Sequence, residues 1–300
     1  MNIFITGGLG FVGRHLSNAF LQQGHRVTAV GRSENPSMID HPDFSYVAAD
    51  TTEAGEWQTL LHDQQVVVNL AGKSIFTFWT EQTKQQIYDS RILTTRNLVE
   101  ALPAGGDTTL CSASAVGYYG DCGDDILTED EPPGDDFLAR VGRDWEKEAL
   151  KAESKGTRVI LARFGIVLDR GGGAMAKMIP AFRLFAGGPL GSGSQWFPWI
   201  HMHDLLAACL FVVDHPDIRG PLNFCAPEPV RNKELVKTLG QKLKRPASMP
   251  APAFLVKLVL GEFGKVLLGS QQVRPAKLEN AGFKFHYPDI DSALEEIVGR

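Results

Sequence analysis

The sequence of 300 residues is poor in cysteine, and its four cysteines are too widely spaced to form a CxxC pair. No cysteine lies in a Cys/His cluster with the spacing of zinc ligands, which excludes the common zinc-binding patterns. Cys111, Cys209 and Cys225 lie in apolar runs, where cysteine usually packs as a small hydrophobic side chain. This use of cysteine is typical of a reducing compartment.

Long apolar runs and an excess of positive charge are also absent. No run approaches the roughly 18 apolar residues of a membrane span, and the opening MNIFITGG lacks the basic and apolar regions of a signal peptide. The formal net charge of −5 gives no electrostatic reason to expect nucleic acid or an anionic membrane as a partner. We therefore expect a cytoplasmic protein, a monomer or a homodimer, that acts on a small molecule.

Glycine, in contrast, is regularly spaced near the beginning of the chain. Three glycines, each three residues from the next, follow the apolar run 2–5 and precede a helical pattern over 11–23. Glycine at such a turn permits a tight bend, close approach of a pyrophosphate, and close packing of helix on strand. The alternative is a glycine-rich turn without a ligand, but a second strand-like run at 26–32 favours a nucleotide. The residues expected to contact it are Gly7, Gly10, Phe11, Val12 and Gly13.

Strand-like and helical segments alternate through the first half of the chain. The strand-like runs are 2–6, 26–30, 44–49, 66–72, 108–116 and 158–163, and the helical stretches are 11–23, 53–63, 81–102 and 137–155. Apolar strands separated by helices predict a parallel sheet that is covered on both faces. The expected fold is therefore α/β, a Rossmann-type doubly wound parallel sheet.

Beyond the sixth strand the sequence becomes rich in glycine and aromatic residues, which predicts a smaller C-terminal lobe for the substrate. We expect residues 1–168 to form the nucleotide-binding Rossmann domain, with residues 196–227 returning to it. The smaller substrate lobe would then comprise residues 169–195 and 228–300.

The end of the second strand indicates which nicotinamide cofactor is bound. An acidic residue there would bind the ribose 2′-hydroxyl of NAD, but the sequence has Arg32 and Ser33. A guanidinium suits a 2′-phosphate, so NADP is expected rather than NAD, unless Arg32 is simply a solvated surface residue. Asp50, at the end of the third strand, could accept a hydrogen bond from the adenine amino group. The fourth strand ends at Asn69, Ala71 and Gly72, which would pass beside the cofactor or only terminate the strand.

Three segments, TGGLGFVG, NLAG and SASAVGYYG, together resemble the extended short-chain dehydrogenase/reductase superfamily, which includes nucleotide-sugar epimerases. The sequence is more similar to one atypical branch, the epimerase-family proteins called family 39U, of the NAD-dependent epimerase/dehydratase superfamily. Long segments such as NLAGKSIFTFWT, LTEDEPPGDDFLARVGRDWEKEA and SQQVRPAKLENAGFKFHYP carry this resemblance over nearly the whole chain. It implies an oxidoreductase or epimerase-like enzyme and leaves the substrate open.

The superfamily's proton-transfer pair is missing. Its members use a serine on the fifth strand to orient the substrate, and a tyrosine whose pKa is lowered by a lysine four residues later. Without such help a tyrosine, with a pKa near 10, is a poor base at neutral pH. No YxxxK occurs in this sequence. The apolar residues Phe137 and Leu138 stand where the tyrosine should fall, and Val141 and Gly142 stand where the lysine should fall.

Ser114 matches the orienting serine, and Tyr118 and Tyr119 follow closely enough to replace the lost tyrosine. Lys73 or Lys84 is an alternative source of positive charge. The structural alternative is that both tyrosines pack in the core with one hydrogen bond each, and that Ser114 only satisfies backbone groups at the strand end.

Further residues are candidates for a substrate pocket. Arg91 could contact a phosphate or simply form an ion pair on its helix, and aromatic side chains could form a pocket wall or pack between the lobes. The candidate pocket residues are Lys73, Trp79, Arg91, Trp196 and Trp199. His201 and His203 lack a third ligand at a recognisable spacing, so no metal site is predicted. Two functions remain open: an NADP-dependent oxidoreductase or epimerase, and a catalytically inactive NADP-binding sensor or scaffold.

Overall fold

Seven parallel strands form the central sheet of the computed structural model, which describes residues 1–33, 38–105, 107–247 and 249–299. The strand order is β12-β7-β5-β4-β1-β2-β3. These strands are β1 (Asn2–Thr6), β2 (Arg26–Gly31), β3 (Phe44–Ala48), β4 (Val66–Asn69), β5 (Thr109–Ala115), β7 (Arg158–Phe164) and β12 (Gly220–Phe224). The order reverses between β1 and β4, and open α/β sheets bind their ligands at such a switch point. The predicted α/β, Rossmann-type fold is confirmed.

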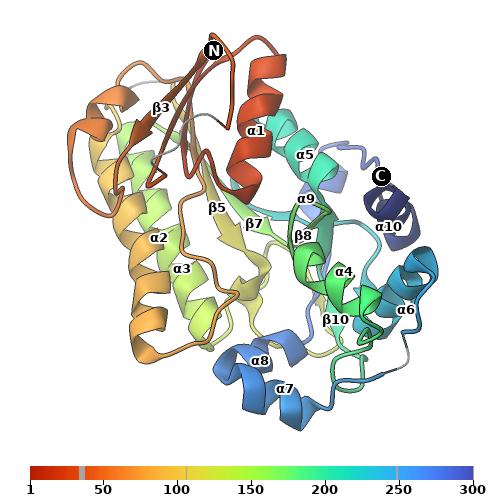
Figure 1. The fold of residues 1–300 in the computed structure, drawn as a ribbon. Helices are drawn as coiled ribbons and strands as arrows, with labels where there is room; N and C mark the ends of the chain where they lie inside the picture. Colours follow the sequence, from red (N-terminus) through yellow and green to blue (C-terminus); the bar gives the residue numbers. More distant parts are fainter. Residues whose placement is uncertain (34–37, 106, 248, 300) are drawn as a thin grey trace.

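Helices cover both faces of this sheet (Figure 1). On one face, α1 (Phe11–Gln22) and α5 (Met202–Asp214) share a core cluster with Ile3 and Ile5 of β1. On the other face, α2 (Glu81–Ala101) and α3 (Phe137–Leu150) share a cluster with Phe4. Successive side chains of a strand point to opposite faces, so a continuous apolar run is required for a sheet that is buried on both sides.

Two predicted helices are shorter than expected. The stretch 53–63 contains only a 3₁₀ helix, η1 (Glu56–Leu61). The helix predicted to run to residue 155 ends as α3 at Leu150, and a 3₁₀ segment, η3 (Lys151–Lys155), continues it. Gly156, with a φ of 84°, then turns the chain toward β7. Amphipathic spacing alone does not separate α from 3₁₀ turns over so few residues.

The remaining elements lie beside the carboxyl ends of the main strands, where Figure 1 places α4, α6, α7 and α8 at the lower right. They are η2 (Val116–Tyr119), β6 (Ile126–Leu127), β8 (Ile166–Asp169), β9 (Gly172–Gly173), α4 (Met175–Arg183), β10 (Trp196–Phe197), β11 (Trp199–His201), β13 (Val230–Arg231), α6 (Asn232–Leu243), α7 (Ala253–Leu260), α8 (Glu262–Leu268), β14 (Gln272–Val273), α9 (Ala276–Asn280) and α10 (Ile290–Gly299). β11 and β9 pair with β8, β10 pairs with β13, and β14 pairs with β6.

A third core cluster joins α4, α6 and α10 around Leu168, Trp199 and Leu235. The chain enters this part more than once, since β12 returns to the edge of the main sheet beside β7. Among the residues that the structure describes, no helix has both the length and the apolar character needed to cross a membrane.

Candidate functional site

The turn between β1 and α1 is built on close backbone contacts that only glycine permits. Gly7 has a φ of 68°, in the left-handed region that other residues rarely adopt. A Cβ on Gly13 would lie 2.2 Å from the carbonyl oxygen of Gly7, so α1 could not pack against the turn. A Cβ on Gly8 would lie 2.5 Å from the Cβ of Ala29 on β2. Gly8 was missed by the sequence reasoning, although the paired glycines of TGG offered the signal.

Gly10 differs from these glycines because it is exposed to solvent. It is the N-cap of α1, has an extended backbone, and provides no side-chain hydrogen bond to the first turn. A Cβ there would meet only the carbonyl oxygen of Gly7, at 3.0 Å. The first N–H groups of a helix have no intrahelical partner and attract an anion. The turn therefore fits a pyrophosphate, held by the backbone of Gly10, Phe11 and Val12.

The Phe11 side chain leaves this cradle and contacts the smaller lobe. A Cβ on Gly172 would lie 2.3 Å from the Phe11 ring, so β9 packs directly over it. The ring also packs edge-on against His15, whose Nε2 lies 3.9 Å from a carboxylate oxygen of Asp169. The ring of Phe11 thus packs between β9 and His15, which leaves its main chain for the predicted cofactor contact.

At the ends of β2 and β3, the structure brings Arg32 and Asp50 close together. Arg32 is exposed, and Asp50 accepts hydrogen bonds from the backbone N and Oγ1 of Thr52 at 2.9 and 2.7 Å. The Thr52 hydrogen bonds, with a smaller contribution from the charge of Arg32, lower the pKa of Asp50. Ser33 adjoins Arg32 at the same edge of the sheet. This edge offers a cation and a carboxylate to a ligand placed beside β2.

Asn69 is fully buried and connects the carboxyl ends of three strands. Its Oδ1 accepts a hydrogen bond from Oγ1 of Thr6 at 2.7 Å. Its Nδ2 donates to Oγ1 of Thr95 at 2.8 Å and to Oγ of Ser112 at 3.3 Å. The side chain of Asn69 therefore stabilises the strand ends from inside the protein. A cofactor beside β4 would be contacted by the backbone that follows Asn69. A Cβ on Gly7 would lie 3.2 Å from the backbone of Ala71, which places the end of β4 against the glycine turn.

Ser114, at the end of β5, is tied to a buried ion pair. Its Oγ donates to Oε1 of Glu146 on α3 at 2.7 Å. Arg163 of β7 donates to both oxygens of Glu146, from Nε at 2.8 Å and from Nη2 at 2.9 Å. The side chains of the pair are only 3% and 7% exposed, so the charges depend on each other. Burial opposes the charge of Arg163, but hydrogen bonds to Glu146 raise its pKa.

Tyr119 belongs to the same buried network. Its hydroxyl donates to Oδ1 of Asn223 at 2.8 Å and accepts from Nη1 of Arg163 at 2.9 Å. The side chain is almost entirely enclosed, and this burial raises its pKa despite the nearby guanidinium. Since both hydrogen bonds are internal, Tyr119 fits the structural alternative better than a role in proton transfer.

Tyr118 packs against α3 at Gly142, one of the residues that stand where the lysine should fall. A Cβ on Gly142 would be 3.3 Å from Cα and 3.4 Å from Cβ of Tyr118. Leu138 lies on the other side, 3.4 Å from a Cβ on Gly117. The guanidinium of Arg163 lies 3.7 Å from the Tyr118 ring centroid. Tyr118 is half-buried; burial raises its pKa, and the charge of Arg163 opposes that rise.

The other candidate residues are distributed over several environments. Trp79 is buried beside Phe263, and Trp199 is 1% exposed in the core of the smaller lobe, so neither lies on an open wall. Lys84 forms ion pairs with Glu81 and Glu262 at 2.8 and 2.9 Å. Lys73 and Arg91, in contrast, lie together at the end of β4, where Nη1 of Arg91 donates to the carbonyl oxygen of Lys73 at 3.0 Å.

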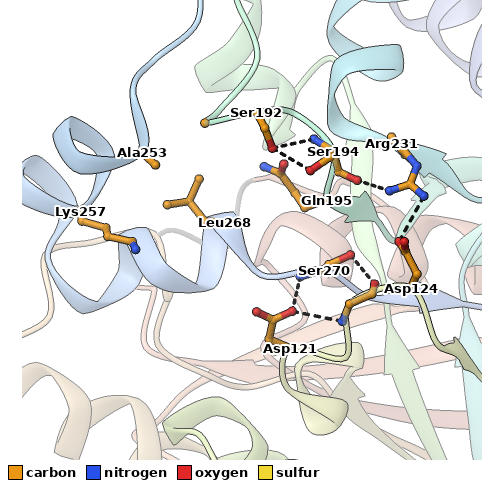
Figure 2. Close-up of a pocket in the computed structure, with 12 residues that line it drawn as sticks. Asp121, Asp124, Ser192, Ser194, Gln195, Arg231, Ala253, Lys257, Leu268 and Ser270 are labelled. Carbon is orange, nitrogen blue, oxygen red and sulfur yellow. Dashed lines mark hydrogen bonds and ion pairs between the residues drawn. The ribbon is translucent and has the colours of Figure 1, made fainter.

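Figure 2 shows a cavity of about 470 Å³. Trp196 is not among its lining residues but contacts two of them, Asp124 and Arg231. Its Nε1 donates to Asp124 at 2.9 Å, and Arg231 lies over its ring and pairs with Asp124 at 3.1 Å. The cavity is lined by Asp121, Gly123, Asp124, Gly191, Ser192, Ser194, Gln195, Arg231, Ala253, Lys257, Leu268 and Ser270. None of these residues is among the candidates from the sequence, because they come from five separate segments without a common motif.

Comparisons with known proteins show which family the chain resembles. Residues 3–223 match the model of the NAD dependent epimerase/dehydratase family, and residues 251–297 match DUF1731, a domain of unknown function. The chain is 41% identical over 302 residues to the epimerase family protein SDR39U1 homolog, chloroplastic, of Arabidopsis thaliana, covering 99% of this chain and 87% of that protein. It is 39% identical over 301 residues to the epimerase family protein YfhF of Bacillus subtilis, covering 99% and 98%.

The solved structures include a similar protein with a bound nucleotide. The crystal structure of human epimerase family protein SDR39U1 (isoform 2) with NADPH matches with a TM-score of 0.88 and 33% sequence identity. The match covers 100% of both chains.

Proposed function

The chain belongs to the NAD dependent epimerase/dehydratase family, and from that premise we propose that it binds NADP in the cleft above β1, β2 and β4. We propose further that it is an oxidoreductase or epimerase-like enzyme for a small polar substrate. The observation that carries this proposal is the glycine cradle at the N-terminus of α1, with the exposed Arg32 at the end of β2. The human relative solved with NADPH supports the same cofactor.

Each part of the cradle has a distinct task in this proposal. The backbone of Gly10 and Val12 holds the pyrophosphate, and Gly7 keeps the turn close to Ala71. Arg32 forms a charge-assisted contact with the 2′-phosphate, while Ser33 adds a hydroxyl. Asp50 accepts from the adenine amino group. Bound NADP would supply or accept a hydride; the protein side chains have to position the substrate and move the proton.

Ser114 and Tyr118 are the residues proposed for that second task. Because Ser114 donates its proton to Glu146, its oxygen is left as an acceptor for a substrate hydroxyl. Tyr118 keeps its proton at neutral pH, since its pKa is raised, so it fits a proton donor to a carbonyl oxygen rather than a base. Arg163, beside its ring, would stabilise the tyrosinate that remains. This arrangement favours reduction of a carbonyl.

A second function, NADP binding without catalysis, is favoured by the residues that replace the superfamily's tyrosine–lysine pair. The side chains of Phe137, Leu138 and Val141 can neither donate nor accept a proton, and Gly142 has none. Tyr119 is enclosed by its own hydrogen bonds. A protein with this site could bind NADP without turnover and act as a redox sensor or scaffold.

One pair of measurements distinguishes the two functions. Isothermal titration with NADP and NAD tests the cofactor, and a steady change in nicotinamide absorbance with a panel of carbonyl metabolites tests turnover. Tight binding together with turnover supports the enzyme. Tight binding without turnover, accompanied by altered affinity for a partner protein, supports the sensor, and weak binding of both dinucleotides contradicts both functions.

We also propose the division of labour between the lobes. Residues 1–168, with 196–227, would hold the cofactor, and residues 169–195 and 228–300 would hold the substrate. The cavity of Figure 2 is the candidate substrate pocket of the smaller lobe, and Trp196 contacts its lining residue Asp124. The four cysteines are free, which suits the reducing cytoplasm, and either a monomer or a homodimer is compatible with this arrangement.

A further inference from the structure

The positive charge of Arg91 has no carboxylate partner among the residues that the structure describes. Arg91 lies on α2, and its Nη1 donates to the carbonyl oxygens of Lys73 and Ile87, both at 3.0 Å. The ion pairs of the described residues do not include it. Sequence reasoning allowed an ion pair on the helix or contact with a phosphate, and the structure provides no ion pair.

The surroundings of Arg91 hold the guanidinium in place without neutralising it. A Cβ on Gly72 would lie 3.1 Å from its Cζ, so the absence of a side chain at Gly72 makes room for it. Its Cζ lies 5.2 Å from the ring centroid of Trp145. Burial lowers the pKa of Arg91 to about 10. An arginine that is desolvated without an acidic partner gains most from an anionic ligand.

The remaining donors of Arg91 are available to such a ligand. Its Nε and Nη2 form no hydrogen bond with the described residues, and neither atom is among those that are sealed from solvent without a partner. A guanidinium has five N–H donors in a fixed fork, and only Nη1 is used here. The edge of the fork formed by Nε and Nη2 therefore has no partner among the described residues.

The position of Arg91 suggests what the anion is. Gly72 directly follows Ala71, whose backbone faces the glycine turn at Gly7. Lys73 follows and likewise has no ion pair among the described residues. Two cations therefore lie at the end of β4, next to the proposed pyrophosphate cradle and on the side away from Arg32, since β2 and β4 flank β1.

We propose that Arg91 binds a phosphoryl oxygen at the carboxyl end of β4. The oxygen belongs either to the diphosphate of the dinucleotide, on its nicotinamide half, or to a phosphate group of the substrate. This inference rests on the proposed NADP site, which supplies the neighbouring ligand. Arg91 is thus a binding residue of the site and not a structural cation of α2.

The chain offers a matched control on the same helix. Arg96 is 45% exposed and pairs with Glu148 at 2.9 Å, so its charge is already compensated. Replacing Arg96 with Met removes one positive charge from α2 but removes no guanidinium donors that are free to bind a ligand. Replacing Arg91 with Lys keeps the charge but removes the planar donor geometry.

The first titration uses NADP, nicotinamide mononucleotide and 2′,5′-ADP with the wild type, R91M, R91K and R96M. If the oxygen belongs to the cofactor, R91M weakens NADP and nicotinamide mononucleotide by about ten- to a hundredfold. It leaves 2′,5′-ADP unchanged, because that fragment lacks the nicotinamide half. R91K is expected to fall between R91M and the wild type, and R96M to match the wild type.

The second titration uses inorganic pyrophosphate, added to the free protein and to the NADP-loaded protein. If the oxygen belongs to the substrate, NADP binds R91M normally, and the loaded wild type binds pyrophosphate while loaded R91M does not. The inference is overturned if R91M, folded by circular dichroism, equals the wild type for every probe in both forms. If the wild type binds neither NADP nor 2′,5′-ADP, the proposed function is contradicted instead. In that case the inference about Arg91 is tested separately, by comparing pyrophosphate binding to the free wild type and to free R91M.

Discussion

Two parts of the proposed site differ in how far they depart from the superfamily pattern. One is the turn between β1 and α1; the other, here called the wall, is formed by Ser114, Tyr118 and Tyr119 after β5 together with the facing residues of α3. The turn keeps its glycines, and each of them is required by a backbone contact or an open cradle. The wall keeps Ser114 but has the apolar residues Phe137 and Leu138 where the superfamily's tyrosine should fall, and Val141 and Gly142 where its lysine should fall. In their place, Tyr118 occupies the space above Gly142, and Arg163 brings the positive charge.

This difference separates cofactor binding from catalysis. Backbone N–H groups hold a pyrophosphate with little dependence on side chains. The turn can therefore keep its ability to bind a dinucleotide as long as its glycines are retained. Proton transfer requires one hydroxyl at one place with a suitable pKa, so the loss of the pair has to be compensated or catalysis is lost. The four predictions below test each side of this comparison.

The largest effect is expected at Tyr118, if the wall is catalytic. On a substrate found by metabolite screening, Y118F should reduce turnover by about 10²–10⁴, because only the hydroxyl of a general acid is removed. NADP affinity should stay nearly constant. As a proton donor with a raised pKa, Tyr118 should keep turnover level up to about pH 10, with a decline above that, and the decline should be absent in the residual activity of Y118F.

Tyr287, in the smaller lobe, provides the control for this experiment, since Y287F removes a hydroxyl outside the wall. Full activity of Y118F would show that the proton comes from another residue, and Lys73 would be tested next. Ser114→Ala should lower turnover with little effect on NADP affinity, and unchanged turnover would mean that this serine serves only Glu146.

The turn is expected to give the next largest effect. Gly10→Val should weaken NADP about a hundredfold or more, because its branched side chain displaces a phosphate from charge-assisted contacts that are each worth about 1.5–3 kcal/mol. The backbone of Gly10 is extended, and its new Cβ would meet only the carbonyl oxygen of Gly7, at 3.0 Å, so the fold should persist after a small shift at Gly7. Isothermal titration measures the affinity. Gly55→Val is a suitable control, since Gly55 is also extended and exposed; undiminished NADP affinity of Gly10→Val would rule the cradle out.

Arg32 should produce a smaller and selective effect. Arg32→Ala should weaken NADP by about ten- to a hundredfold and leave NAD almost unchanged, because only the 2′-phosphate contact is lost. High salt should reduce the wild type's preference for NADP, since the side chain is exposed. Arg26→Ala, at the opposite end of β2, controls for the change in net charge. An equal loss for both dinucleotides would show that Arg32 does not read the 2′-phosphate.

The sequence predicts the turn better than the wall for a physical reason. The strands, their order of apolar runs and the glycine spacing are local features, and a motif of a few residues defines them. The network of Ser114, Glu146, Arg163 and Asn223 joins residues from four parts of the chain. No local pattern shows that Arg163 reaches Glu146, or that Tyr119 points inward while its neighbour lies over the guanidinium.

Gly142 also shows that the sequence does not reveal contacts between distant segments. In the sequence it appears only as a missing lysine, whereas in the structure it leaves the space that Tyr118 fills. The buried positions of Trp79 and Trp199 were likewise open in the sequence, because an aromatic residue near a cleft has the same local pattern whether it faces solvent or core.

The smallest effect is expected at Tyr119, which tests whether the wall's second tyrosine is structural. Y119F keeps the ring but removes the hydrogen bonds to Asn223 and from Arg163, so urea unfolding should show a loss of about 1–3 kcal/mol. The raised pKa of Tyr119 in the folded state means that its contribution is fully present below the unfolded pKa, near 10. That contribution is lost as the pH rises from there toward the folded pKa, by at most about 1.4 kcal/mol per pH unit. The wild type should therefore lose stability above pH 10 more steeply than Y119F. If Y119F is as stable as the wild type, with the same alkaline slope, its hydroxyl is not part of the network, and Tyr119 becomes a candidate proton donor again.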